Sequence, residues 1–134
     1  LAESILKTLK NKKISILGLS FKPETDDLRS SPALDAIKIL LEKNANVFAF
    51  DPIFKLNPDI IKIPEKCNIC SNIEDALKNS DIALVFTKWE EFKSLDSNFL
   101  KQLMRNPIII DGRGFLEKDK FDDGCYFKIG YSEQ

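Results

Sequence analysis

Three cationic side chains follow apolar segments of the chain. Lys22 and Arg29 come after the segment at residues 13–19, and Arg113 comes after the segment at residues 107–110. Ammonium and guanidinium groups form strong, charge-assisted hydrogen bonds to phosphate and carboxylate oxygens. These residue types and their positions therefore indicate a site for a phosphorylated or otherwise anionic ligand.

A strand, a loop and a helix must position the first two cations. Residues 13–19 predict a strand and residues 20–31 predict a polar loop. Ser31 before Pro32 predicts the start of a helix, because serine caps a helix and proline fits its first position. The loop after a parallel strand lies at the carboxyl edge of the sheet, where α/β folds bind ligands. The unpaired N–H groups of a helix's first turn also favour anions there.

Apolar segments and helical periodicity alternate along the rest of the chain. Residues 53–70 are interrupted by prolines and predict a loop with one short helix or strand. The alternation favours a single α/β domain of three layers, with a doubly wound and mainly parallel sheet. We predict helices at residues 1–11, 32–43 and 73–79 and two short ones within 88–104, and strands at 13–19, 46–50, 81–87, 107–110 and, at the sheet edge, 126–129.

Polar residues follow three of the predicted strands. Gly18 ends the apolar part of the first, Asp51 follows the second, and Asp111 comes two residues before Arg113. In a parallel sheet these strand ends share one edge. We therefore expect Lys22 and Arg113 to converge on one ligand, although they are far apart in the sequence.

The composition limits the class of protein. Lysine and arginine number 20 against 21 acidic residues, so we expect no bulk nucleic-acid binding. No apolar run approaches the roughly 20 residues of a membrane span, and no signal peptide is recognised, so we expect a cytoplasmic protein without membrane contact.

The three cysteines, an odd number, fit reduced thiols. Cys67 and Cys70 have metal-site spacing, but without a second pair or any histidine we expect core or strand-edge thiols and no metal.

Four separated segments resemble one protein family. They read ILGLSFKPETDDLRSSPALDAIKILL at 16–41, FDP at 50–52, TKWEEF at 87–92 and IIIDGRG at 108–114. In this order and spacing they resemble the C-terminal, nucleotide-sugar-binding domain of the UDP-glucose/GDP-mannose dehydrogenases, which is Rossmann-like. The resemblance assigns residues 1–12 to the end of a connector helix from a preceding domain, and residues 13–134 to the UDP-sugar-binding domain.

The resemblance implies part of an NAD-dependent nucleotide-sugar 6-dehydrogenase, similar to UDP-glucose 6-dehydrogenase. Such enzymes oxidise the C6 alcohol of a UDP-sugar to a uronate with two NAD+. The implied partners are the UDP-sugar and the N-terminal NAD-binding and central domains of the same polypeptide, in a homodimer or a larger assembly. The N-terminal domain would hold most of the NAD.

The resemblance also implies roles for four residues. Phe21 and Lys22 match a Phe-Lys pair that contacts the nucleotide sugar. Arg113 matches an arginine that contacts the sugar diphosphate, and Arg29 matches an arginine that reaches toward NAD. The resemblance thus implies a substrate site formed by Phe21, Lys22 and Arg113, with Arg29 directed at the cofactor.

The sequence departs from the family pattern in several places. None of the cysteines has the Gly-rich context of the family's catalytic cysteine, and the Gly-rich dinucleotide fingerprint is missing. We therefore assign no catalytic residue and expect no turnover by this chain alone. Gly114 stands where an asparagine is common, and Asn44 replaces a frequent glycine at a predicted left-handed helix end.

Other interpretations remain open. The alternative substrates are GDP-mannose and a UDP-N-acetylhexosamine. A second interpretation is a non-catalytic α/β module that binds a nucleotide or phosphate, and a third is a structural domain that mediates interdomain or subunit contact. Lys22 can also be a solvated loop lysine, Arg29 a partner of Asp26 or Asp27, and Arg113 a turn residue whose charge faces water.

Overall fold

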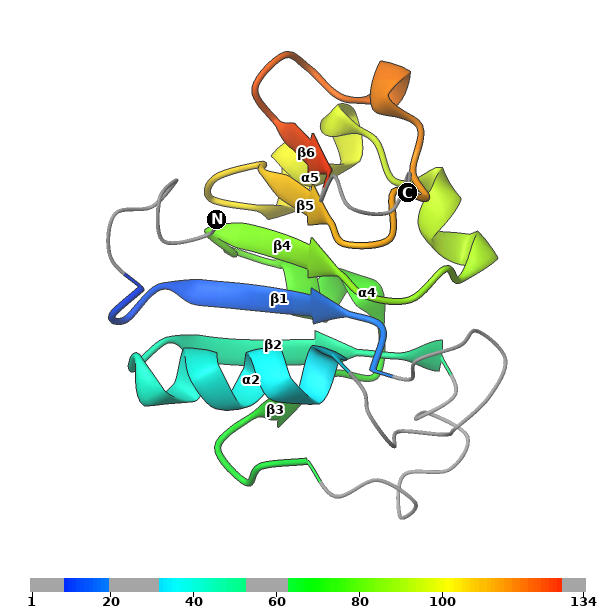
Figure 1. Ribbon diagram of the computed structural model, residues 1–134. Coiled ribbons are helices and arrows are strands. Elements are labelled where there is room, and N and C mark those ends of the chain that lie inside the picture. Colours follow the sequence, from blue (N-terminus) through cyan, green and yellow to red (C-terminus); the bar gives the residue numbers. More distant parts are fainter. Residues whose placement is uncertain (1–8, 20–31, 53–62, 129–134) are drawn as a thin grey trace.

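The computed structural model describes residues 9–19, 32–52 and 63–128 of the 134-residue chain. Within these ranges six strands form one sheet in the order β3-β2-β1-β4-β5-β6, and each neighbouring pair is parallel (Figure 1). The strands are β1 (Lys13–Leu17), β2 (Asn46–Phe50), β3 (Asn68–Ile69), β4 (Ile82–Val85), β5 (Ile109–Asp111) and β6 (Tyr126–Lys128).

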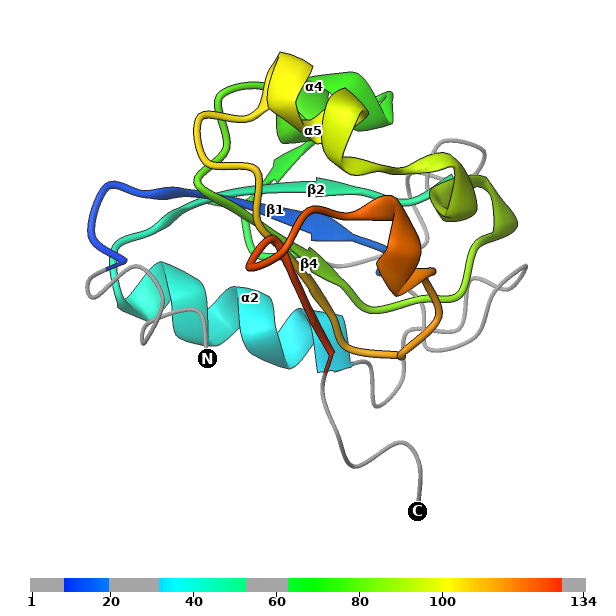
Figure 2. The ribbon, with the colours of Figure 1, turned by 90° about the horizontal axis from the view of Figure 1, so that it is seen from above.

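Helices cover both faces of the sheet (Figure 2). On one face lies α2 (Pro32–Glu42), and on the other lie α4 (Ile73–Leu77) and α5 (Ser97–Leu103). The described ranges also contain two short 3-10 helices, η1 (Glu90–Ser94) and η2 (Lys118–Lys120). This arrangement confirms the predicted three-layer, doubly wound α/β fold. None of these helices is long and apolar enough to cross a membrane.

The strands are apolar because both faces of the sheet are covered. Ile14 and Ile16 pack into the cluster beneath α2, whereas Leu17 packs into the cluster beneath α4 and α5. All three side chains are fully buried. Ser15 is a buried exception, and its hydroxyl donates to the carbonyl oxygen of Ala76. A near-continuous apolar run is the pattern expected of a strand in a parallel sheet with two covered faces.

The predicted strands are all present, with ends that differ by one or two residues. A further strand, β3, forms within the segment that was predicted as a loop with one short helix or strand. Asn44 has a φ of 65°, which confirms the left-handed end of α2. The predicted helix at 1–11 lies mostly outside the described residues. Its last part is wrong, because residues 9–12 leave the helical path at Asn11, whose φ is 63°.

Gly18 lies where the end of β1 meets the end of β4. Its φ is 96°, and a Cβ at this position would lie 2.5 Å from Oγ1 of Thr87. Thr87 is fully buried and follows β4 in the chain. A larger residue at position 18 would therefore combine an unfavourable backbone conformation with a steric clash. Only glycine fits the approach of the two strand ends.

We predict that Gly18→Ala lowers the free energy of unfolding by about 2–5 kcal/mol, the sum of backbone strain and overpacking. Gly124→Ala is the matched control, because Gly124 also has a positive φ, 80°, but its Cβ would meet no atom within 4 Å. That variant should lose only about 1–2 kcal/mol. Urea unfolding of both variants measures the difference. Equal losses would show that the contact with Thr87 has no energetic importance.

Candidate functional site

The carboxyl ends of β1, β4 and β5 lie next to one another at the centre of the sheet (Figure 1). From β1 the chain proceeds to β2 and β3 on one side, and then crosses to β4, β5 and β6 on the other. Open α/β sheets bind ligands outside the strand ends where the strand order reverses in this way. The candidate site therefore lies at the ends of β1 and β4, with β5 beside them.

Asp111 ends β5 with a fully buried carboxylate. Its Oδ2 accepts hydrogen bonds from the backbone N–H groups of Phe115 and Leu116, both at 2.7 Å. Its Oδ1 accepts the backbone N–H of Arg113 at 3.0 Å. A buried carboxylate is costly unless it is hydrogen-bonded, so these donors stabilise one conformation of the turn at residues 111–116. The position of Arg113 follows from that turn.

Tyr126 on β6 provides a fourth hydrogen bond to the same carboxylate. Its phenol donates to Oδ2 of Asp111 at 2.7 Å, and its ring stacks on Phe121 with centroids 5.1 Å apart. Burial, together with the hydrogen bond to Asp111, raises the pKa of Tyr126 above its usual value. The sequence did not reveal this role, because an edge-strand tyrosine has no pattern that identifies its hydrogen-bond partner.

Arg113 extends from this turn toward the centre of the sheet. Its side chain is partly buried, and its Nη1 lies 3.5 Å from the carbonyl oxygen of Phe86, at the long limit for a hydrogen bond. Phe86 follows β4, and its own N–H donates to the carbonyl oxygen of Leu17 at the end of β1. The structure therefore brings the Arg113 guanidinium to the β1–β4 strand ends.

Gly114 has a φ of 62°. Glycine adopts this left-handed conformation without strain, and asparagine tolerates it better than most residues. Both Gly114 and the asparagine that is common here in the family that the sequence resembles are therefore compatible with this backbone geometry.

Phe21, Lys22 and Arg29 lie outside the described residues, so their assigned roles stay predictions. The convergence of Lys22 with Arg113 also stays a prediction. Leu19, which directly precedes that segment, lies at the same edge of the sheet and donates its backbone N–H to Oδ2 of Asp51 at 2.7 Å. The chain thus enters the predicted ligand loop beside the candidate site.

Asp51 and Trp89 form a contact that sequence reasoning missed. Trp89 and Phe92 pack in the cluster beneath α4 and α5. The Trp89 indole N–H also donates to Oδ2 of Asp51, at 3.3 Å. The sequence offered only a general signal for this contact. A buried tryptophan usually has a hydrogen-bond partner for its indole N–H, but the sequence does not identify that partner.

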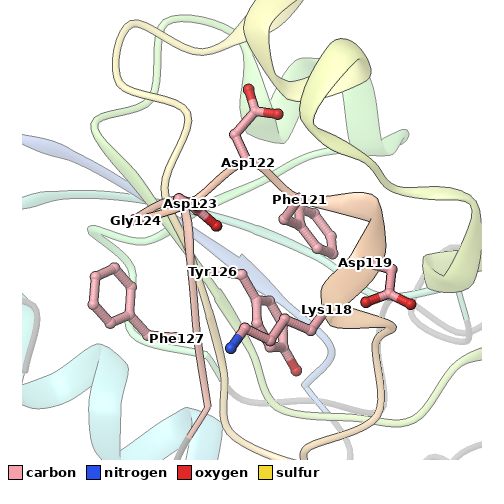
Figure 3. Close-up of a pocket in the computed structure, with 8 residues that line it drawn as sticks. All are labelled: Lys118, Asp119, Phe121, Asp122, Asp123, Gly124, Tyr126 and Phe127. Atoms are coloured by element: carbon pink, nitrogen blue, oxygen red, sulfur yellow. The ribbon is translucent and has the colours of Figure 1, made fainter.

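A hollow of about 580 Å³ lies beside β6, with Tyr126 in its lining (Figure 3). Its lining includes three aspartates, Asp119, Asp122 and Asp123, and a single lysine, Lys118. Asp122 also forms an ion pair with Lys101 at the surface. An excess of carboxylates repels a diphosphate. We therefore do not assign the anionic ligand to this hollow.

Cys67 and Cys70 flank β3 and are both free thiols, as is Cys125. Burial raises the pKa of Cys67 to about 12, and burial also raises the pKa of Cys70. A thiol that stays protonated is a poor nucleophile and a poor metal ligand. This confirms the interpretation of Cys67 and Cys70 as core or strand-edge thiols. In the part of the chain that the structure describes, no cluster of three or more His, Cys, Asp or Glu could hold a metal ion.

We predict that Tyr126→Phe removes a pH dependence of stability in alkaline solution. Because the pKa of Tyr126 is raised in the folded state, the folded chain keeps a proton that the unfolded chain loses above about pH 10. The stabilisation by Tyr126 is therefore complete below that pH and declines above it. At pH 7 the variant should lose about 1–2 kcal/mol of unfolding free energy with the hydrogen bond to Asp111.

Urea unfolding of both proteins between pH 7 and pH 10.5 measures this effect. The two curves of unfolding free energy against pH should approach each other at the alkaline end. Curves that stay parallel over the whole range would contradict the raised pKa of Tyr126.

The chain is similar to known proteins over most of its length. A sequence model of the UDP-glucose/GDP-mannose dehydrogenase family, UDP binding domain, matches residues 15–118. The chain is 35% identical over 123 residues to UDP-glucose 6-dehydrogenase TuaD of Bacillus subtilis, covering 92% of the chain and 26% of that protein. It is 42% identical over 123 residues to UDP-glucose 6-dehydrogenase of Rickettsia conorii, covering 92% and 27%. The chain thus spans about a quarter of the length of these relatives.

The fold agrees with solved structures of similar proteins. The UDP-D-ManNAc dehydrogenase of Pyrococcus horikoshii superposes with a TM-score of 0.74 at 26% identity. The superposition covers 99% of this chain and 29% of that one. The fold of this chain therefore recurs as one part of a larger protein.

Proposed function

Because the chain belongs to the UDP-glucose/GDP-mannose dehydrogenase family, as its UDP-binding domain, we propose that it binds the nucleotide part of a UDP-sugar at the carboxyl ends of β1, β4 and β5. The observation that supports this most directly is the position of Arg113. Its guanidinium lies at the strand ends where the sheet reverses order, beside the point where the chain leaves β1.

Lys22 and Arg113 supply the positive charge for the diphosphate in this proposal. A guanidinium can donate two parallel hydrogen bonds to phosphate oxygens, and an ammonium adds a compact charge. Phe21 contacts the nucleotide sugar next to Lys22. The turn held by Asp111 keeps Arg113 at the edge before ligand arrives, which lowers the entropy lost on binding.

The chain acts, in this proposal, within a longer polypeptide that also has an N-terminal NAD-binding domain and a central domain. The complete enzyme oxidises the C6 alcohol of a UDP-sugar to a uronate with two NAD+, as a homodimer or larger assembly. UDP-glucose is the preferred substrate, and GDP-mannose and UDP-N-acetylhexosamines are the alternatives. The three free cysteines support a reducing, cytoplasmic compartment.

The end of β1 does not fit NAD. A dinucleotide-binding turn needs a second glycine for backbone approach to the pyrophosphate and a third for helix packing. Ser20 and Pro23 stand at those two positions after Gly18. The cofactor therefore belongs to another domain of the polypeptide, and Arg29 is the residue of this chain that we assign toward it. The chain alone does not catalyse the reaction, since none of its cysteines is assigned as a nucleophile.

Calorimetric titration of the chain with UDP and GDP tests the proposal. UDP should bind more tightly than GDP. Lys22→Ala and Arg113→Ala should each raise the dissociation constant for UDP about 10- to 100-fold, because a hydrogen bond to a charged group contributes about 1.5–3 kcal/mol.

Arg105→Ala is the control for Arg113→Ala. Arg105 is an exposed arginine whose Nη1 lies 3.9 Å from Asp81, at the amino end of β4 and so at the opposite edge of the sheet. Its loss should leave UDP affinity unchanged. Failure of UDP to bind the unsubstituted chain, or equal effects of the two arginine variants, would contradict the proposed site.

The role of Arg29 is tested in the full-length polypeptide. Arg29→Ala should raise the KM for NAD about tenfold, since it removes a charged contact with the cofactor, and should leave the dissociation constant for UDP unchanged. Steady-state kinetics at saturating UDP-sugar measure the first quantity and calorimetry the second. A change in UDP affinity alone would place Arg29 at the substrate instead.

A further inference from the structure

The carboxylate of Asp51 is buried among the strand ends of the candidate site. Asp51 follows β2 and is 1% exposed. Its Oδ2 accepts the backbone N–H of Leu19 at 2.7 Å and the indole N–H of Trp89 at 3.3 Å. These donors come from the residues that follow β1 and β4. One carboxylate oxygen therefore connects the ends of β2, β1 and β4. These three strands are neighbours in the sheet (Figure 1).

The hydrogen bond to Leu19 continues the pairing of β1 with β2 beyond the sheet. A backbone hydrogen bond at the end of this strand pair runs from the N–H of Gly18 to the carbonyl oxygen of Phe50, at 2.8 Å. One residue further, the N–H of Leu19 is accepted by the side chain of Asp51 instead of by backbone. Leu19 therefore stays attached to β2 after the chain has turned at Gly18.

The second hydrogen bond connects this point to a well-packed part of the core. Trp89 is 8% exposed and lies in the cluster beneath α4 and α5. Because its ring is held by packing, its N–H offers the Asp51 carboxylate a donor at a fixed position. Asp51 is in turn held in the orientation that accepts the Leu19 N–H.

Asp51 is poorly suited to contact an anionic ligand itself. Its charge would repel a diphosphate, and its side chain has almost no surface accessible to solvent. Its effect must therefore pass through the residues that it holds. Leu19 precedes Phe21 by two positions and Lys22 by three. Leu19 is therefore the described residue that directly precedes the predicted ligand loop.

We propose that Asp51 is a positioning residue for nucleotide binding, which acts through the Leu19 N–H to hold the end of β1 beside the ends of β2 and β4 at the candidate site. The inference rests on the proposed function. It differs from it by assigning ligand affinity to a residue of β2 that does not touch the ligand.

Three variants separate this role from general stability. Asp51→Ala removes both hydrogen bonds. Asp51→Asn keeps one acceptor oxygen, and Trp89→Phe removes the indole donor while leaving an aromatic ring in the core. The control is Leu100→Ala, which leaves a cavity at a fully buried position of α5 and removes neither of these two donors to Asp51. It lowers stability through lost packing.

Two measurements on each variant decide the inference. Amide hydrogen exchange followed by NMR reports the protection of Leu19, and calorimetry reports the dissociation constant for UDP. In Asp51→Ala the exchange of the Leu19 amide should become at least tenfold faster than in Leu100→Ala, and the dissociation constant should rise about tenfold. Asp51→Asn and Trp89→Phe should change the Leu19 exchange rate and the dissociation constant for UDP in the same direction, but less than Asp51→Ala does. Leu100→Ala should bind UDP like the unsubstituted chain.

Several results would overturn the inference. Unchanged UDP affinity in Asp51→Ala and Asp51→Asn would remove the role of Asp51. Weaker binding with normal Leu19 protection would show that Asp51 does not act through Leu19. If Asp51→Ala does not fold, the same two measurements on Asp51→Asn and Trp89→Phe decide the matter. Absence of UDP binding by the unsubstituted chain is a separate result, which would overturn the proposed function and this inference together.

Discussion

The contact between the ends of β1 and β4 is the constraint on which the carboxyl edge of the sheet depends. Gly18 allows the two strand ends to approach until a single added carbon would clash with Thr87. The N–H of Phe86 donates to the carbonyl oxygen of Leu17 at 2.9 Å and holds the same two strands. The residues that follow β1 and those that follow β4 therefore leave the sheet at the same point of its carboxyl edge. Arg113 reaches that place from β5 through its contact with the Phe86 carbonyl oxygen.

Two buried carboxylates organise this edge, although the proposed ligand is an anion. Asp51 follows β2 and Asp111 ends β5, and each is satisfied mainly by N–H donors of the turns that it holds. Because these carboxylates are buried, their hydrogen bonds offset part of the cost of burial. Arg113 receives a fixed backbone from Asp111, and its guanidinium is directed elsewhere. Stabilisation of the backbone and binding of the ligand are thus divided between different residues.

The sequence predicted the fold well because the two patterns that indicate it, apolar runs and helical periodicity, are each contained within a short segment. Apolar runs mark strands that are covered on both faces, and their alternation with helical periodicity predicts a doubly wound sheet. It also predicted that Asp111 and Arg113 lie at a strand end. It did not predict the contacts of Asp51 with Trp89, or of Tyr126 with Asp111, since these pairs are distant in sequence and depend on the register of neighbouring strands. The helix predicted at 1–11 was wrong for residues 9–11, where the helical pattern did not anticipate a turn with Asn11 in the left-handed conformation.

A crystal structure of the chain with UDP would test the central claim most directly. The account predicts that the diphosphate lies at the carboxyl ends of β1, β4 and β5. Oxygens of the diphosphate should be about 3 Å from the Arg113 guanidinium and from the Lys22 ammonium, the distance of a charge-assisted hydrogen bond. A diphosphate bound in the hollow beside β6, or at the amino edge of the sheet, would contradict it.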